Sequence, residues 1–409
     1  MTRMLIVLSC MLFSASPAFA MTLEQAVEAA LKNNPNLQVL RQEQIAAQGR
    51  LDQAGLLLQS NPVIEGGLSN KKNQIDAGGE QFQNYELRLS QEFEIAGQRG
   101  QRIAAASMDR EKVMLETKDR ERLLTAEVKD AFARALASKK KKELAGETVK
   151  LQEELFAFAE IKFKAGEVAA LEMNLAVVEL GKAKRDLLLA TREERESLLS
   201  LQGLLGLRPD TGFTAEGELP SGAPSAPDKE GLRSLAAAWR PDIQAVSADV
   251  SATTSAMRLA GRQAVPNVTL SGFYEKDERA DITGLMLSIP LPLFDRNQAG
   301  RKEARTRAEQ ARIRQAGLER SVERELEEAL VGFTTAIEEL TLFRKEILDK
   351  ALENLELVNL SYKEGKIGFF EVRLAQKDTL DAQFAYLESR LRMQLAVNAL
   401  EKATGGSLK

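Results

Sequence analysis

The chain has 409 residues, with 60 acidic and 56 basic side chains and a formal net charge of −4. This near balance lacks the basic excess of a nucleic-acid-binding protein, and the absence of histidine removes the commonest general base and soft metal ligand. Aromatic residues make up 5% and charged residues 28%, a composition typical of long, solvated helices.

Residues 1–20 have the features of a secretory signal peptide. A basic start at Arg3 precedes the apolar run 4–13, and Ala18-Phe19-Ala20 forms a small-x-small cleavage site. The run is shorter than the about 20 apolar residues of a membrane span. The only cysteine, Cys10, lies here, and lipoprotein-type cleavage before it is the weaker alternative because too few apolar residues precede it. Cleavage after Ala20 would leave a mature chain without cysteine, hence without disulfides or thiolate metal sites.

A block of sequence recurs 199 residues apart. Phe163-Lys164-Ala165-Gly166-Glu167-Val168, followed by Glu172, returns as Tyr362-Lys363-Glu364-Gly365-Lys366-Ile367, followed by Glu371. Three shorter echoes keep the same order: Asn34–Leu37 with Arg240–Ile243, Leu87–Ser90 with Leu285–Ser288, and Gly97–Gly100 with Asn297–Gly300. Four echoes in one order predict a duplicated unit. The first repeat covers 21–207 and the second 232–409, joined by a Pro/Gly/Ser-rich linker at 208–231 that is expected at the surface.

Each repeat is expected to run helix, strand, loop, strand, long helix, turn and returning helix. The strands are predicted at about 62–69 and 82–95 in the first repeat, and at about 266–275 and 282–294 in the second. Apolar and polar residues alternate along them, which is typical of a strand between two environments. One face carries Tyr85, Leu87 and Leu89 in the first repeat, and Leu285, Leu287 and Ile289 in the second.

Proline placement permits very long helices. There is no proline between Pro62 and Pro209, or after Pro292, which leaves stretches of 146 and 117 residues. An interior proline costs a helix about 3 kcal/mol, so its absence matters. Apolar residues spaced by four and three positions from Leu318 to Leu340 indicate a helical stripe with heptad character. A helix over about 97–163 would be about 100 Å long at 1.5 Å per residue.

Four strands with one apolar and one charged face suggest a membrane barrel shared between chains. An open sheet cannot lie in lipid because its edges leave backbone groups unsatisfied, and closed barrels need about eight strands or more. Three chains would supply twelve. The apolar face would then meet lipid, and the charged face would line a water-filled lumen. Candidates for aromatic girdles are Tyr85, Phe93, Phe273, Tyr274 and Phe294. The alternative is a soluble β-sandwich edge with a solvated polar face.

The arrangement resembles the outer-membrane factor (TolC-like) family of trimeric efflux channels over essentially the whole mature chain. The marks of the family are Leu23-Glu24-Gln25-Ala26, Asn33–Leu37, Arg240–Ile243 and the two recurring blocks. Gln53-Ala54-Gly55 with Asn61-Pro62, and Leu89–Arg99, resemble its heavy-metal (CzcC-like) branch. The resemblance implies a mainly α fold with a small β part. It would form a homotrimer with a shared twelve-stranded barrel in the outer membrane of a Gram-negative bacterium, on a long α-helical periplasmic tunnel.

The resemblance also implies a role for the recurring blocks, whose glycines by themselves indicate only helix turns. In the family such turns form the periplasmic tip that meets an adaptor (membrane fusion protein). The docking residues here would be Lys164, Gly166, Val168, Lys363, Gly365 and Ile367. Glu371, with Glu172 in the first repeat, would constrict the pore. A second acid often follows three residues later in the family, but this chain has Leu374 there.

The sequence contains no nucleophile–base arrangement, phosphate-binding loop or metal-ligand spacing, so no catalytic, cofactor or metal site and no enzyme activity is expected. The leading hypothesis is a passive outer-membrane exit duct of a tripartite exporter, driven by an inner-membrane RND-type pump. Its cargo would be heavy-metal cations or small molecules. Two alternatives stay open: a soluble periplasmic coiled-coil scaffold or adaptor, and the same duct serving protein secretion or drug efflux.

Overall fold

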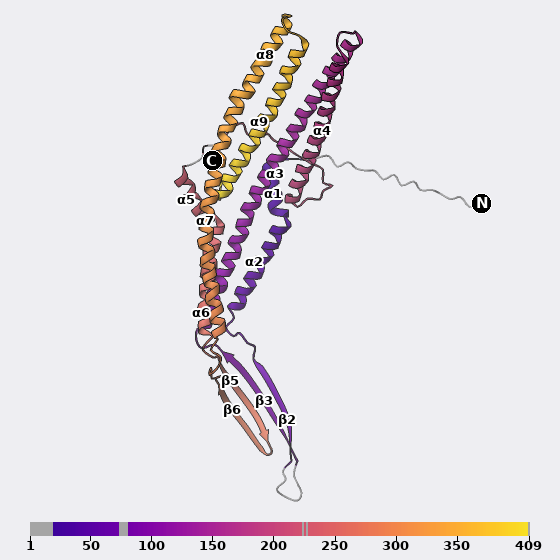
Figure 1. The fold of residues 1–409 in the computed structure, drawn as a ribbon. Helices are drawn as coiled ribbons and strands as arrows, with labels where there is room; N and C mark the ends of the chain where they lie inside the picture. The colour runs from indigo at the N-terminus through magenta and orange to yellow at the C-terminus, as the bar shows by residue number, and fades with distance from the viewer. Residues whose placement is uncertain (1–18, 73–80, 223–224, 226–227, 408–409) are drawn as a thin grey trace, which may run out of the picture. The chain divides into compact units, whose positions relative to one another are not determined.

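The computed structural model describes residues 19–72, 81–222, 225 and 228–407, and the chain divides into two compact units (Figure 1). Within the described residues, the helical unit comprises 19–38, 120–239 and 322–407. The sheet unit comprises 39–119 and 240–321. Each unit takes segments from both repeats. The predicted signal peptide lies outside the described residues except for its last two positions.

The sheet unit is built on one four-stranded antiparallel sheet. Its strands are β2 (Val63–Lys72), β3 (Gln81–Phe93), β5 (Val268–Asp277) and β6 (Ala280–Ser288), in the order β2-β3-β5-β6. The hairpins of the two repeats therefore join through β3 and β5, and β2 and β6 are the edges. β2, β3 and β5 begin and end within three residues of the predicted ranges, whereas β6 ends at Ser288, six residues before its predicted end. β6 ends before Pro290 and Pro292, which lack the N–H that a ladder needs.

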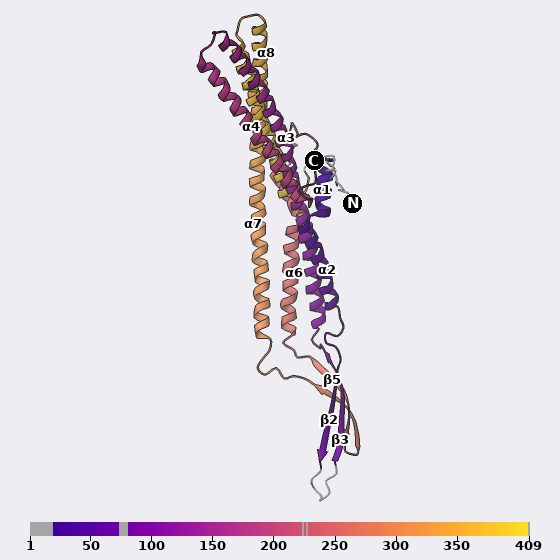
Figure 2. The same cartoon turned by 90° about the vertical axis from the view of Figure 1, so that its right-hand side faces the viewer.

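Four helices connect to the sheet. The segments of these helices nearest the sheet run alongside one another (Figure 2). They are α2 (Pro35–Ala54), α3 (Gln98–Lys164), α6 (Pro241–Arg262) and α7 (Gln298–Leu342). The predicted long helix is confirmed, since α3 runs 67 residues without a break. Among the described residues, none of the helices combines the length and the apolar character needed to cross a bilayer.

The two strand-to-helix junctions are built alike. Gly97 and Asn297 take left-handed backbone, with φ of 71° and 54°. The glutamine that follows each of them accepts a hydrogen bond from a backbone N–H two residues earlier, at 2.8 Å for Gln98 and 2.7 Å for Gln298. The duplication seen in the sequence thus extends to the local backbone.

The helical unit contains the returning helices of both repeats. They are α4 (Ala170–Leu205) and α9 (Phe369–Thr404), with α1 (Leu23–Asn33), α5 (Lys229–Trp239) and α8 (Asp349–Lys363). A π-helical turn, η1 (Phe343–Leu348), separates α7 from α8, whereas α3 has no such interruption. The heptad spacing of the second repeat predicts no such break.

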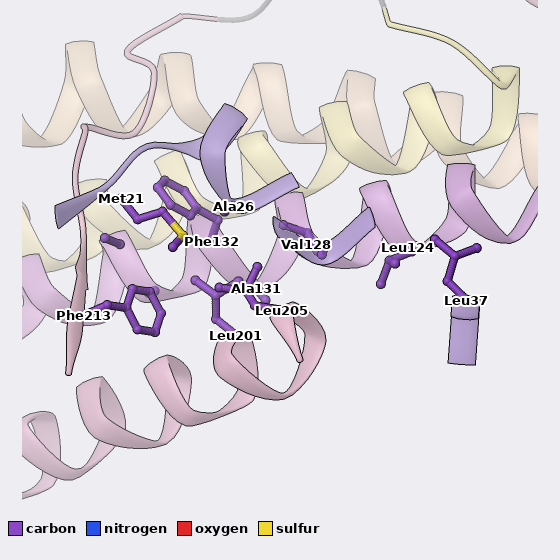
Figure 3. Packing of buried hydrophobic residues seen from close by; sticks show 13 residues of the cluster. Met21, Ala26, Leu37, Leu124, Val128, Ala131, Phe132, Leu201, Leu205 and Phe213 are labelled. Carbon is purple, nitrogen blue, oxygen red and sulfur yellow. The ribbon is translucent and has the colours of Figure 1, made fainter. Parts of the chain in front are cut away.

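The core of the helical unit lies where α1, α3 and α4 meet (Figure 3). Leu37, Leu124, Val128, Leu201 and Leu205 are fully buried there. Burying each of these side chains stabilises the fold by about 1.5–3 kcal/mol relative to exposure. The cluster therefore holds the returning helix of the first repeat against α3.

The linker is partly a core element. β4 (Phe213–Ala215) pairs in parallel with β1 (Phe19–Met21), and Phe213 and Ala215 are buried in the cluster of Figure 3. Leu219 packs in a second cluster with side chains of α3 and α9. The prediction that 208–231 is surface chain is therefore wrong for these positions, because isolated apolar residues within a Pro- and Gly-rich stretch anchor it.

Candidate functional site

The sheet presents an exposed apolar face. Residues paired across antiparallel strands point to the same side, so the register places Leu87 with Gly66 and Tyr274, and Leu89 with Ile64. The large apolar side chains of this face are Ile64, Leu68, Tyr85, Leu87, Leu89, Leu270, Tyr274, Leu285 and Leu287. Leu87 is 55% exposed and Leu285 81%. A contiguous exposed patch of this kind marks an interaction surface.

The length of this face matches a bilayer. From Tyr85 to Phe93, β3 pairs with β5 without a gap, and about nine residues at about 3.3 Å each span about 30 Å. The hydrocarbon core of a membrane is about 30 Å thick and is crossed by strands of about 9–11 residues. Tyr274 lies near the loop between β5 and β6, and its hydroxyl donates a hydrogen bond to Asp281 at 2.9 Å. The side chain thus combines an apolar ring with a hydrogen-bonded polar tip.

The opposite face is mainly polar, although the register also places Val63, Ile282 and Met286 on it. Arg88 forms an ion pair with Glu86, and the hydroxyls of Ser90 and Ser271 lie 2.9 Å apart across β3 and β5. Further along, Asn267 donates to the Glu92 carboxylate at 2.8 Å. The Nε atom of Arg88 is buried and has no hydrogen-bond partner within the part of the chain that the structure describes. Such a surface is suited to water and ions.

One predicted girdle residue lies on this polar face. Phe273 pairs with Arg88, and its ring lies against Gly284, where an added Cβ would come within 2.7 Å of the ring. Neighbouring residues of a strand point to opposite sides, so Phe273 and Tyr274 cannot both face lipid. The prediction for Phe273 is therefore wrong. Phe93 lies on the apolar face opposite Val268, whereas Ile289 and Phe294 follow the end of β6.

The two recurring blocks form helix turns of the same design. Gly166, after α3, and Gly365, after α8, have φ of 75° and 70°, so both predicted left-handed turns are confirmed. In each turn the glycine N–H and the next N–H bond back to carbonyls of the helix that ends there. The contacts are Gly166 to Phe163 at 3.0 Å, Glu167 to Lys162 at 2.9 Å, Gly365 to Tyr362 at 3.0 Å and Lys366 to Ser361 at 2.9 Å. This pattern is the Schellman motif, which closes the C-terminus of a helix.

Charged side chains surround both turns. Lys164 ends α3 with its side chain 70% exposed and forms a 2.9 Å ion pair with Glu160. At the second turn Lys363 is exposed, and Lys366 forms a 2.6 Å ion pair with Glu364. Val168 and Ile367, the apolar residues of the blocks, are half-buried. Each turn therefore offers a small apolar centre bordered by charges.

The two acids proposed for the pore occupy equivalent positions. Glu172 and Glu371 are the third residues of α4 and α9, and both are exposed. The Glu371 carboxylate turns back toward its own helix start, with one oxygen 2.9 Å from where a Cβ on Gly368 would lie. An acid in the first turn complements the unpaired N–H groups of the helix N-terminus. Each glutamate therefore also has a local structural role.

A cluster that joins the two hairpins was not predicted. Arg373 of α9 forms a 2.6 Å ion pair with Glu154 of α3 and lies 4.5 Å from the centre of the Phe369 ring. That ring is 4.1 Å from the ring of Phe158, also on α3. The partners are more than 200 positions apart, and no periodicity in either helix indicates which residues of the two hairpins meet.

The sheet unit contains a groove of about 530 Å³ lined by charged and apolar residues, most of them on α2, α3, α6 and α7. Asp249, 8% exposed, lies at its wall and accepts hydrogen bonds from Lys112 at 3.0 Å and Arg314 at 2.7 Å. Burial raises the pKa of Asp249, but these two cationic donors outweigh it and hold the pKa below its ordinary value. The sequence signal is an acid on the alanine-rich buried face of α6, beside Ala245 and Ala252.

The family follows from a comparison with known proteins. Residues 26–207 and 232–406 match the family model described as outer membrane efflux protein. The chain belongs to this family. It is an efflux protein of the outer membrane of a Gram-negative bacterium, and its two matched stretches correspond to the duplicated elements described above.

Individual members of the outer membrane efflux family resemble the chain along most of its length. The cobalt-zinc-cadmium resistance protein CzcC of Cupriavidus metallidurans is 24% identical over 401 residues, which cover 96% of this chain and 92% of the relative. The outer membrane protein OprJ of Pseudomonas aeruginosa is 25% identical over 412 residues, covering 94% and 84%. The solved structure of the outer-membrane channel OprN has a TM-score of 0.77 at 20% identity, covering 94% of this chain and 90% of that one. This likeness shows a shared fold.

Proposed function

We propose that this efflux protein is the outer-membrane exit duct of a tripartite exporter, assembled as a homotrimer with one twelve-stranded barrel. The observation that carries the proposal is a two-faced sheet with two free edges, β2 and β6. Strand direction alternates through β2, β3, β5 and β6. A neighbour's β2 placed beside β6 by rotation would therefore run antiparallel to it, and three copies would close the ring without an open edge.

The two faces of the sheet then have separate partners. The apolar face, with Leu87, Leu89, Leu285 and Leu287, meets lipid, while the face with Glu86 and Arg88 lines the water-filled passage. Mass measurement of the purified chain in detergent tests the assembly. The expected result is the mass of a trimer, together with a β-rich species that migrates in dodecyl sulfate as a heat-resistant trimer. A stable folded monomer would contradict the proposal.

The helix turns at Gly166 and Gly365 are proposed to dock a periplasmic adaptor, which couples the duct to an inner-membrane RND-type pump. Their exposed lysines and half-buried Val168 and Ile367 support this role, because a small apolar centre with a charged border is typical of a protein-binding surface. A photo-crosslinker at Lys363 should capture the adaptor in cells. The same probe at Lys350, also on α8 with its side chain 70% exposed, is the matched control.

Glu371, with Glu172 in the equivalent position, is proposed to narrow the passage at the same end. Their place in the first turns of α9 and α4, next to the proposed docking turns, supports this assignment. Like charges brought together by a threefold axis would form an acidic ring that favours cations. Planar-bilayer recordings of ion selectivity test this role separately from docking.

Heavy-metal cations are the proposed cargo. The support is the likeness to the C. metallidurans protein, whose name specifies cobalt, zinc and cadmium resistance and which aligns over nearly the full length of both chains. In cells that carry the matching pump and adaptor, loss of this chain should raise cellular cobalt, zinc or cadmium and lower the tolerated concentration. Unchanged metal content together with altered sensitivity to organic drugs would instead assign the duct to drug efflux.

A further inference from the structure

Exposed basic side chains gather where the sheet meets its helices. Arg258 lies near the end of α6, and Arg296, Arg301, Lys302 and Arg305 lie just before and within the first turns of α7; these five residues are called the basic collar. All five are exposed. None of them forms an ion pair with any residue that the structure describes. Arg296 donates a hydrogen bond to the neutral Pro292 carbonyl at 3.1 Å, so the positive charge of all five side chains remains available to an external anion.

Few acidic side chains lie near the basic collar in the sequence of α7, and those present already have partners within the chain. Glu303 is paired with Arg307 at 2.6 Å, and Glu309 lies 3.6 Å from Arg312. Asp295 accepts a backbone hydrogen bond from Asn297 at 2.8 Å. The surface at this level therefore keeps a local positive excess, although the whole chain is slightly acidic.

The collar lies on the outer side of the sheet unit. The groove is continuous with the polar sheet face, because the groove residue Arg102 pairs at 2.5 Å with Glu94, which continues the alternation of Glu86 and Arg88. On α7 the groove is lined by Gly300, Glu303, Ala304 and Arg307. At about 100° per residue, Lys302 and Arg305 lie on the opposite side of that helix, and Arg258 is likewise opposite the groove residues of α6. The collar therefore shares its side with the apolar sheet face.

Large apolar side chains accompany the collar. Between β6 and α7, Leu291, Leu293 and Phe294 are exposed, Phe294 at 91%. The order along the chain is an apolar strand face, exposed apolar residues and then unpaired cations. This is the order of environments at a membrane surface, where the hydrocarbon ends and the lipid phosphates begin.

We infer that the basic collar binds the phosphate groups of phospholipids in the periplasm-facing leaflet of the outer membrane and so fixes the depth of the barrel. The inference rests on the proposed lipid contact of the sheet. Charge complementarity and continuity with the apolar face favour lipid over a second copy of the chain.

The test is retention of phosphatidylglycerol by the purified full-length protein in neutral detergent, counted by native mass spectrometry during a lipid titration. The variant R301Q/K302Q/R305Q should need at least about tenfold more lipid for the same occupancy. The control R307Q/R312Q/R320Q removes three charges from the same helix and should stay within about twofold of the wild type. The charge-preserving variant R301K/R305K should bind like the wild type. An excess of inorganic phosphate should not displace the lipid.

Equal loss in the collar variant and the control would overturn the inference, and so would unchanged binding by a collar variant that inserts normally. If the triple variant fails to insert, Arg305→Gln alone gives the same comparison with one charge. A changed oligomeric mass of the collar variant without lipid would make this face a contact between copies and would also overturn it. Failure of the barrel proposal has a different signature, since the wild type would then retain no lipid and remain monomeric.

Discussion

Arg373 of α9 and Glu154 of α3 form a 2.6 Å ion pair that links the returning helix of the second repeat to the long helix of the first. The Arg373 guanidinium also lies 4.5 Å from the centre of the Phe369 ring, which is 4.1 Å from the Phe158 ring. The link therefore combines an ion pair, a cation–π contact and an aromatic pair within one cluster. It lies near the turns that we propose as the docking end, so it bears on how firmly the two hairpins are held together.

Arg373→Ala should loosen this link. The side chain of Glu154 is 60% exposed and that of Arg373 16%, so the ion pair contributes about 0–1 kcal/mol, and the cation–π contact adds about 0.5–1 kcal/mol. If the hairpins close the passage at this end, single-channel conductance in planar bilayers should rise. Lys377→Ala is the control, because its 3.2 Å ion-pair partner Asp381 lies on the same helix. Equal conductance for the wild type and Arg373→Ala would show that the cluster only packs the helices.

Leu87→Arg and Arg88→Leu form a matched pair on one strand. Leu87 lies on the exposed apolar face and Arg88 on the polar face of β3. A charge placed in the lipid near the bilayer midplane costs about 2–4 kcal/mol, whereas a leucine in the lumen leaves the barrel intact. Urea titration of folding into lipid vesicles measures the difference. Equal destabilisation by both changes would show that the sheet does not lie in the membrane.

Asp249→Asn should lower stability in a pH-dependent way. Removing a hydrogen-bonded charge costs about 1.5–3 kcal/mol, and the low end applies because Arg314 is 57% exposed. Since the folded pKa of Asp249 is lowered, its contribution is present above the unfolded value of about 3.9 and is lost as pH falls through the folded pKa. The difference in melting temperature between variant and wild type should therefore be full at pH 7 and shrink below about pH 4.

Asp109→Asn is the control for that experiment. Asp109 pairs with Arg50 at 3.2 Å, but both side chains are more than 40% exposed. An exposed pair of this kind contributes about 0–1 kcal/mol. The role assigned to Asp249 would be contradicted if Asp249→Asn lowered the melting temperature no more than Asp109→Asn does. It would also be contradicted if the difference in melting temperature between Asp249→Asn and the wild type persisted undiminished at low pH.

Glu371→Gln separates the pore role from the local one. As a first-turn acid, Glu371 stabilises its helix by about 0.3–1 kcal/mol, and glutamine should lose only that. As part of an acidic ring, its loss should also reduce the preference for cations in planar-bilayer recordings. Glu356→Gln, an exposed acid on α8, is the matched control. A selectivity unchanged by Glu371→Gln would leave only the helix-end role.

The parts of the fold that depend on local pattern could be predicted from the sequence, and the long-range contacts could not. Alternation predicts the two faces of β3, and the absence of proline permits the 67-residue helix α3. Both features are set by neighbours within a few residues. Aromatic type alone places the adjacent Phe273 and Tyr274 together in the membrane girdle, whereas the alternation of the strand puts them on opposite faces. The ring of Phe273 packs against Gly284, and this residue lies on the next strand, β6.

The candidate site divides in the same way. The left-handed turns at Gly166 and Gly365 follow from the glycines themselves, since few other residues adopt that backbone without cost. The pairing of Arg373 with Glu154, and of Asp249 with Lys112 and Arg314, depends on which faces of distant helices meet. Surface charges are frequent on every helix of this chain, so no spacing singles these pairs out.

Gly365→Val tests the docking turn. The backbone at Gly365 has a φ of 70°, which costs a β-branched residue about 1–3 kcal/mol, although no described residue beyond its two chain neighbours lies within 4 Å of an added Cβ. The effect is therefore backbone strain in the turn rather than a clash. Gly181→Val is the control, because Gly181 lies within α4 and its Cβ position is equally open. Trimer mass and insertion should be unchanged in both variants, since neither change touches the strands. Export and crosslinking to the adaptor should fail only for Gly365→Val, because the Schellman turn that positions Lys363 and Ile367 is altered. Normal export by Gly365→Val would mean that this block is an ordinary helix turn and that the adaptor binds elsewhere.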